Sequence, residues 1–189
     1  MKFVPTNLRD AFIIEPELFD DNRGFFARTF CTREFAQHGL ENAFPQCSVS
    51  FNRTKGTVRG MHFQKPPACE AKLVRVTAGA IYDVIIDLRP NSPTYLQHIG
   101  VELSAQNHRA LYVPKMFAHG FQTLEDNSEV FYQISEFYVP EASSGLRYND
   151  GSLRIDWPLP VSVLSDRDAN WPLINPNRFH PSACGCALA

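Results

Sequence analysis

Short apolar segments follow one another closely from residue 46 to residue 138, and this spacing constrains the possible fold more than any other feature. Clusters of turn-forming residues separate them, for example at 53–56, 90–93 and 125–127. Short strands at this spacing are typical of an all-β sandwich or small barrel. The predicted strands cover residues 46–53, 57–64, 71–78, 80–88, 97–104, 110–113, 119–125 and 128–138.

The flanking regions add two strands and one helix to this prediction. Strands are predicted at 11–14 and 25–30, with a turn-like segment at 19–24. Residues 32–39 predict a short helix, because Thr32 is a suitable N-cap residue and Gly39 a suitable terminator. From residue 158 the chain is predicted to be irregular. We expect a single domain over residues 1–175 and an irregular or disordered tail over residues 176–189.

Composition excludes several classes of protein. With 189 residues, 44% of them hydrophobic, and a net charge of −2, the chain suits one globular domain. The sequence has no cluster of Lys and Arg of the kind that would indicate a nucleic-acid partner. No apolar run approaches the ~20 residues of a membrane-spanning helix, and residues 1–6 are too polar for a signal peptide. Five Cys with no zinc-site spacing indicate reduced thiols, so we expect a cytoplasmic protein.

Two basic side chains lie in otherwise apolar strands. In the predicted strand 57–64, alternation places His62 on the same face as Val58, Gly60 and Gln64. A histidine in such a position is most often a hydrogen-bonded core residue. Lys72 shares a face with Val74 and Val76, so it needs a partner or an anionic ligand if that face is buried. The alternative is a lysine on an edge strand that reaches solvent.

Two further polar residues, His119 and Tyr132, lie in apolar strands and complete a chemical set. Tyr132 alternates with Val130 and Ile134, a pattern in which the hydroxyl is most often bound to backbone. Together with His62 and Lys72 they offer a base, a cation and a weak acid that one barrel could bring together. This combination suits removal of a proton next to a carbonyl group.

A metal site was the main alternative for this region. Small β-barrel metal sites often use two His two residues apart, a carboxylate and a distant His. Here Gln64 stands in the second His position, which leaves His62, Glu70 and His119 as an incomplete set. We therefore expect no metal and no other cofactor. The chain also contains no glycine-rich phosphate loop and no G-x-S-x-G motif.

With these residues in view, the sequence resembles the dTDP-4-dehydrorhamnose 3,5-epimerase family of cupin-type nucleotide-sugar epimerases. The similarity extends from about Asn7 to Ile174. The resemblance implies a cupin-type jelly-roll β-barrel with a few short helices. The blocks that carry it are Asp21-Asn22-Arg23-Gly24-Phe25-Phe26, Arg59-Gly60-Met61-His62-Phe63-Gln64, Lys72-Leu73-Val74-Arg75-Val76, Ile81-Tyr82-Asp83-Val84, Phe117-Ala118-His119-Gly120-Phe121 and Gly145-Leu146-Arg147-Tyr148-Asn149-Asp150.

The resemblance also implies an activity, the inversion of C3 and C5 in dTDP-4-dehydro-6-deoxy-D-glucose to give dTDP-4-dehydro-L-rhamnose. By resemblance, His62 is the general base, oriented by Asp168, and Tyr132 is the acid on the opposite face of the sugar. Lys72 and His119 would stabilise the enolate oxygen at C4. Other residues would bind the nucleotide, with Arg59 and Arg23 on phosphate and Tyr138 stacked on the base. The family is metal-free and usually homodimeric, and an N-terminal segment brings Arg23 to the partner's site.

Departures from the family pattern lie on the nucleotide side. Arg28 stands where the family commonly has Glu, and Gln46-Cys47-Ser48-Val49-Ser50 replaces Gln-Asp-Asn-His-Ser. Ser143 replaces an acid and Arg167 replaces a Lys. Glu accepts a hydrogen bond from the N3–H of thymine, whereas Arg only donates. These positions remain candidate substrate-binding residues, but three alternatives stay open: a single inversion, a CDP- or GDP-linked sugar, and a cupin that binds a nucleotide sugar without catalysis.

One geometric conflict remains in the sequence. Strict alternation along the predicted strand 57–64 places Arg59 and His62 on opposite faces of the sheet. A bulge at Gly60 would bring the two side chains to the same face.

Overall fold

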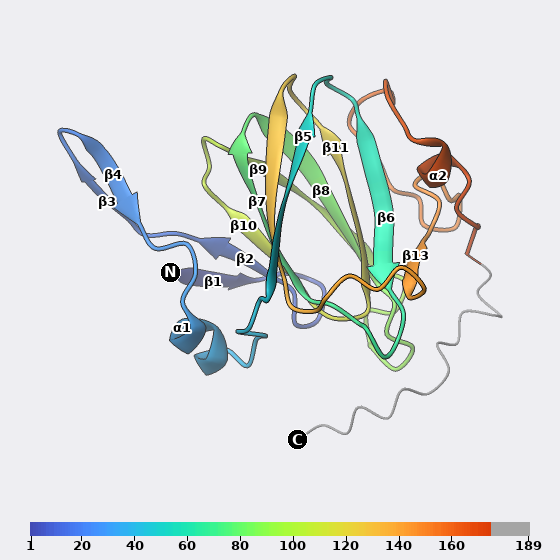
Figure 1. The fold of residues 1–189 in the computed structure, drawn as a ribbon, viewed down its shortest axis with the longest axis horizontal. Coiled ribbons are helices and arrows are strands. Elements are labelled where there is room, and N and C mark those ends of the chain that lie inside the picture. The colour runs from blue at the N-terminus through green and yellow to red at the C-terminus, as the bar shows by residue number, and fades with distance from the viewer. Residues whose placement is uncertain (175–189) are drawn as a thin grey trace.

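The structure is a computed structural model that describes residues 1–174. The predicted tail, 176–189, lies outside the described residues. Two antiparallel sheets face each other, as Figure 1 shows, which confirms the predicted all-β jelly-roll class. The first sheet has the order β1 (Lys2–Pro5), β2 (Phe12–Glu15), β10 (Ala110–Val113), β7 (Lys72–Ala78), β12 (Ser128–Ile134), β5 (Gln46–Asn52). The second has the order β13 (Ser143–Gly145), β6 (Val58–Gln64), β11 (Phe117–Thr123), β8 (Ala80–Asp87), β9 (His98–Ser104).

The main core fills the space between the two sheets. Val74, Leu111 and Val130 from the first sheet meet Ile85 and Phe121 from the second, and all five are buried. Alternate side chains of each strand point inward, so the apolar residues of one face collect here. The pocket described below lies between the same two sheets.

The outer faces of both sheets are covered as well. A short helix, α1 (Thr32–Gln37), presents the buried Phe35 to the outer face of the first sheet, where Tyr112 and Leu73 belong to the same cluster. Leu153 and Ile174 from the C-terminal segment cover the outer face of the second sheet. Coverage on both sides explains why β8 and β11 are buried along almost their whole length. No helix in residues 1–174 is long and apolar enough to cross a membrane.

The structure corrects several sequence-based boundaries. The segment 19–24 is no simple turn, because β3 (Leu18–Asp21) and β4 (Gly24–Ala27) form a hairpin that projects from the barrel in Figure 1. Helix α1 is capped by Cys31 without a side-chain bond, so the Thr32 cap is wrong. The strand predicted at 128–138 ends at Ile134. The predictions missed β1, β13 and α2 (Asp166–Ala169), which lies in the segment predicted as irregular.

Candidate active site

A pocket of about 350 Å³ lies between the two sheets and brings most of the predicted site residues together. Strands β5, β7 and β12 of the first sheet form one wall, and β6, β11 and β13 of the second sheet form the other. Predicted site residues from both walls, from the loop after β12 and from α2 line it: Gln46, Ser48, Arg59, His62, Lys72, His119, Tyr132, Tyr138, Ser143 and Arg167. Asp168 lies behind His62, whereas Arg23 and Arg28 are elsewhere.

A bulge in β6 places Arg59 and His62 in the same pocket. His62 pairs with His119 and Arg59 pairs with Phe121, so the register shifts by one residue at Gly60 and Met61. Gly60 has φ +135°, and a Cβ there would lie 2.5 Å from the Cα of Gly120. Only glycine fits such a conformation and such a close approach. The bulge therefore resolves the conflict that strict alternation creates.

His62 is held by a carboxylate from the C-terminal segment. Its Nε2 lies 2.6 Å from Oδ1 of Asp168. Asp168 is almost fully buried, and it also accepts hydrogen bonds from the indole of Trp171 and the backbone N–H of Gly60. Burial raises the pKa of Asp168, but the hydrogen bond with His62 and the backbone and indole donors outweigh it, so the pKa lies below its ordinary value. An ionised Asp168 accepts from Nε2–H, which leaves Nδ1 free to take a proton.

Helix α2 fixes the position of that carboxylate. Ser165 is its N-cap, and the Ser165 hydroxyl accepts a hydrogen bond from the backbone N–H of Asp168. This arrangement satisfies one of the free donors in the first turn of the helix. Asp168 therefore points from a capped turn toward β6 rather than from a free loop.

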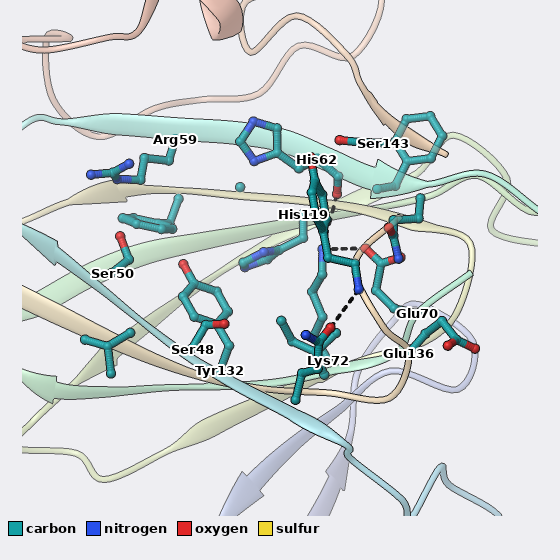
Figure 2. A pocket seen from close by; sticks show the side chains of 18 of the residues that line it. Ser48, Ser50, Arg59, His62, Glu70, Lys72, His119, Tyr132, Glu136 and Ser143 are labelled. Carbon is teal, nitrogen blue, oxygen red and sulfur yellow. Dashed lines mark hydrogen bonds and ion pairs between the residues drawn. The ribbon is translucent and has the colours of Figure 1, made fainter. Parts of the chain in front are cut away.

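Tyr132 approaches the pocket from the opposite sheet. Figure 2 shows its ring on β12, facing the wall from which His62 extends. Among the described residues its hydroxyl has no hydrogen-bond partner, so the expected bond to backbone is absent. Burial, reinforced by the charge of Asp83 and opposed by Arg59, raises the pKa of Tyr132 well above its ordinary value. The hydroxyl therefore keeps its proton at neutral pH.

Two cationic or potentially cationic groups have buried carboxylate partners. Nε2 of His119 lies 2.6 Å from Oδ1 of Asp83, and both side chains are almost fully buried. Nζ of Lys72 lies 3.1 Å from Oε1 of Glu70, a contact drawn as a dashed line in Figure 2. Val74 and Val76, which share a face of β7 with Lys72, are buried, so the condition under which Lys72 needs a partner is met, and Glu70 is that partner.

Polar contacts also order the outer part of the pocket. The Nε of Arg59 donates to Oδ1 of Asn52 at 2.7 Å, which directs the guanidinium from β6 toward β5. The amide oxygen of Gln46 accepts from the backbone N–H of Tyr138. Arg167 donates to the hydroxyl of Ser143 at 2.7 Å.

Arg23 and Arg28 do not line the pocket of their own chain. Arg23 lies in the turn of the β3–β4 hairpin and pairs with Asp21, and its side chain is 85% exposed. Arg28 follows β4 and pairs with Glu34 of α1. A single chain therefore does not bring these two predicted substrate-binding residues to His62.

Some partners of the site residues were missed by sequence reasoning. Asp83 could have been found, because it is a charged residue in the apolar segment 80–88. Asn52 and Trp171 gave no signal, since their importance depends on a side-chain contact between β5 and β6 of opposite sheets and on the fold of the C-terminal segment.

Gln64 is engaged by backbone groups rather than left free as a ligand. Its amide donates to the carbonyls of Ala68 and Phe137 and accepts from the N–H of Val139. Within residues 1–174, no group of three His, Cys, Asp or Glu side chains is arranged to hold a metal ion.

Comparison with known proteins connects this geometry to one family. The family profile for dTDP-4-dehydrorhamnose 3,5-epimerase matches residues 5–176. The enzyme of that name from Methanothermobacter thermautotrophicus is 43% identical over 179 residues, which are 93% of this chain and 96% of that protein.

Solved structures agree with the sequence comparison. An epimerase of the same name from Bacillus anthracis, solved with TDP and PPi, has a TM-score of 0.89 and 47% identity over 92% of this chain and 99% of that one. A dTDP-6-deoxy-D-glucose-3,5-epimerase from Legionella pneumophila, solved with dTDP-4-keto-L-rhamnose, has a TM-score of 0.86 and 37% identity over 93% of this chain and 95% of that one. The chain therefore belongs to the dTDP-4-dehydrorhamnose 3,5-epimerase family.

Proposed function

We propose that this chain is an epimerase that inverts C3 and C5 of dTDP-4-dehydro-6-deoxy-D-glucose and gives dTDP-4-dehydro-L-rhamnose. The observation that carries the proposal is the opposition of His62 and Tyr132 across one pocket, with His62 bound to Asp168 at 2.6 Å. The Legionella relative bound to dTDP-4-keto-L-rhamnose supports the choice of substrate.

The reaction follows from the acidity of hydrogens next to a ketone. A C4 carbonyl makes the C3 and C5 hydrogens acidic, because the carbanion delocalises onto the carbonyl oxygen. Nδ1 of His62 takes the proton while Asp168 stabilises the imidazolium that forms. Tyr132 then gives a proton to the same carbon from the opposite face, and this inverts the centre. No electron leaves the sugar, so a redox cofactor is not needed.

Lys72 and His119 supply the positive environment for the C4 oxygen. Both lie in the partly enclosed pocket, where a fixed charge stabilises a developing oxyanion more than it would in water. Asp83 holds the ring of His119 through Nε2 at 2.6 Å, so Nδ1 is the ring nitrogen that would contact the substrate oxygen.

The outer part of the pocket would hold the nucleotide. Arg59 suits phosphate, since a guanidinium binds phosphate oxygens through two donors, and Tyr138 offers a ring on which a base can stack. Gln46, Ser48, Ser143 and Arg167 surround this part of the pocket with hydrogen-bonding groups.

The proposal includes a homodimer. The exposed Arg23 lies on a hairpin that projects away from the barrel in Figure 1, so it suits a contact with the site of a second copy. Leu18, Phe19, Phe25 and Phe26 on the same hairpin are exposed, and an interface would bury them. A cytoplasmic location is also proposed, supported by the free thiols of Cys31 and Cys47.

A second candidate keeps the chemistry and changes the nucleotide. It is favoured by the pairing of Arg28 with Glu34, and by the hydrogen bond between Arg167 and Ser143 where the family pattern has a Lys and an acid. A CDP- or GDP-linked 4-keto sugar would meet these donors with a different set of acceptors.

Solvent deuterium exchange over a panel of dTDP-, CDP- and GDP-linked 4-keto-6-deoxy sugars separates these candidates. We expect the dTDP sugar to exchange at C3 and C5 and to have the highest kcat/KM. Exchange that is fastest with another nucleotide would favour the second candidate, and exchange at one carbon would indicate a single inversion. If every sugar binds but none exchanges hydrogen with solvent, the proposal that the chain is an enzyme would be contradicted.

We also expect activity to survive extensive chelation, because the amide of Gln64 is used by backbone groups. Loss of activity on chelation and recovery with one added divalent ion would contradict this expectation.

A further inference from the structure

Glu70 is a buried carboxylate that lines the pocket beside the reacting groups. It precedes β7, its side chain is 6% exposed, and its Oε1 lies 3.1 Å from Nζ of Lys72. Lys72 is itself only 12% exposed. Burying a charge is costly unless an opposite charge and hydrogen bonds compensate it, so each of these two groups depends on the other.

Neither group has a strong alternative partner among residues 1–174. Oε2 of Glu70 is buried with no hydrogen-bond partner, and the other contact of Nζ is the carbonyl oxygen of His62 at 3.5 Å. That distance is at the limit of a hydrogen bond, so the carboxylate is the group that fixes where the ammonium lies. An intact pair holds Nζ between β7 and the backbone of the strand that carries the proposed base.

The surroundings of Lys72 contain other titratable groups that have to be considered. Strand β6 contributes His62 and Arg59, β11 contributes His119, and β12 with the segment after it contributes Tyr132 and Glu136. The two strands that flank β7 place Val113 and Ile134 opposite Lys72, and neither of them titrates. Within the described part of the chain, none of these groups forms an ion pair with Lys72, whereas Glu70 does.

We propose that Glu70 is a positioning residue that holds Lys72 beside the C4 oxygen. This inference rests on the proposed function, in which Lys72 stabilises the enolate. Removing the carboxylate would leave the buried ammonium of Lys72 without its counter-charge and without the group that fixes its place. Without the ion pair, the flexible Lys72 side chain could also adopt other rotamers, and Nζ would then leave the position that the transition state requires.

The test compares Glu70→Gln and Glu70→Asp with the matched control Glu41→Gln. Glu41 forms a 2.7 Å ion pair with Lys115 outside the pocket, so the control removes a carboxylate from a lysine without touching the site. Deuterium exchange at C3 and C5 is measured over a range of substrate concentrations to give kcat and KM, and thermal unfolding is measured on the same samples.

For Glu70→Gln we expect kcat to fall by roughly 10-fold or more with KM nearly unchanged. Glu70→Asp keeps a carboxylate and should show a smaller loss of kcat, and Glu41→Gln should match the wild type. A purely structural ion pair would lower the melting temperature and leave kcat and KM unchanged.

The Lys72→Ala background separates this inference from the function on which it rests. There, adding Glu70→Gln should cause no further loss of exchange, and it should raise the melting temperature because it removes an unpaired buried carboxylate. A folded Glu70→Gln variant with normal kcat, next to an inactive Lys72→Ala, would overturn the inference alone. Wild-type exchange in Lys72→Ala would overturn the proposed role of Lys72, and the inference with it.

If Glu70→Gln does not fold, Glu70→Asp decides the question. A lowered kcat at unchanged KM supports the positioning role, and a wild-type kcat overturns it.

Discussion

The pocket and the β3–β4 hairpin hold their charged residues in opposite ways. In the pocket, Asp168, Asp83 and Glu70 are buried, and each has a cationic or titratable partner within 3.1 Å. On the hairpin, Arg23 is 85% exposed, and its one ion-pair partner within residues 1–174 is Asp21, two residues away. The proposed proton-transfer groups are therefore fixed within one chain, whereas the proposed phosphate ligand on the hairpin is not.

The apolar residues follow the same division. Val74, Val130 and Phe121 form a core between the sheets, while Phe19 is 67% and Phe26 is 74% exposed on the hairpin. A fixed pocket lowers the cost of ordering catalytic groups during each turnover. An exposed apolar hairpin gains stability only when another surface covers it. We therefore expect substitutions in the pocket to change proton exchange within one chain. Substitutions on the hairpin should change substrate binding across the proposed dimer.

The largest effect is expected at His62. His62→Ala and His62→Asn should reduce exchange at both carbons by roughly 10²–10⁴-fold or more, because the general base is lost while the barrel remains. Position-resolved deuterium incorporation and circular dichroism on the same sample test this. A folded variant that retains about a third of the wild-type exchange rate would remove His62 from the role.

Tyr132→Phe should separate the two halves of the reaction. Deprotonation by His62 persists, whereas inversion falls by at least ~10²-fold because Phe has no proton to give. Exchange with retention is the expected outcome, measured as deuterium content and product configuration. If the tyrosine only stabilised the fold, exchange and inversion would fall together with a lowered melting temperature.

Arg23→Ala should act on binding across the proposed dimer. Loss of one charge-assisted contact to phosphate, worth about 1.5–3 kcal/mol, should raise KM by roughly 10–100-fold with a smaller change in kcat. Arg53→Ala is the matched control, since this exposed arginine lies outside the pocket.

Mixing subunits sharpens that test. A mixture of refolded Arg23→Ala and His62→Ala chains should regain activity, because each mixed dimer holds one site with both native residues. No recovery in a mixture shown to contain mixed dimers would contradict the shared site.

The smallest expected effect is the pH dependence of stability. Both Asp168 and Asp21 have a pKa below the ordinary value. At Asp168, burial raises the pKa, but the hydrogen bond with His62 and the other donors lower it by more. At Asp21, the hydrogen bond with the side chain of Arg23 lowers the pKa. A lowered pKa stabilises the fold above the ordinary carboxyl pKa, and this stabilisation is lost as the pH falls through the folded-state value.

Because Asp168 is buried and Asp21 is exposed, the two variants should differ. Asp168→Asn should remove a pH-dependent contribution on the order of 1 kcal/mol from the acid limb of the unfolding free energy. Asp21→Asn should leave that limb unchanged, since exposed pairs contribute little. Denaturant unfolding between neutral and acid pH measures both, and equal slopes for Asp168→Asn and the wild type would contradict the buried role.

The strands of the barrel were predictable because their apolar periodicity is strong and their separators contain turn residues. The hairpin was predicted only in part. The strand predicted at 25–30 overlaps β4, whereas β3 was missed, since the hairpin side chains are largely exposed and no core pattern marks them. Helix α2 has four residues, too few for a periodic signal, although Ser165 before Asp166 is an N-cap pattern.

The site divides along the same line. His62, Lys72, His119 and Tyr132 stood out as polar residues in apolar strands. The bulge could be suggested at Gly60 but not established from the sequence, because it depends on the register between β6 and β11. The partners Asn52 and Trp171 come from segments far apart in sequence, and only the fold brings them to Arg59 and Asp168.

The central claim is that a base on one wall and an acid on the other move protons at carbons next to the C4 ketone. The most direct test is a single turnover of the wild-type enzyme in D₂O with the dTDP-linked 4-keto-6-deoxy sugar, with the product read by NMR. The account predicts deuterium at both C3 and C5 in a product inverted at both carbons. Inverted product that keeps the substrate hydrogens at these carbons, or bound sugar without exchange or inversion, would contradict it.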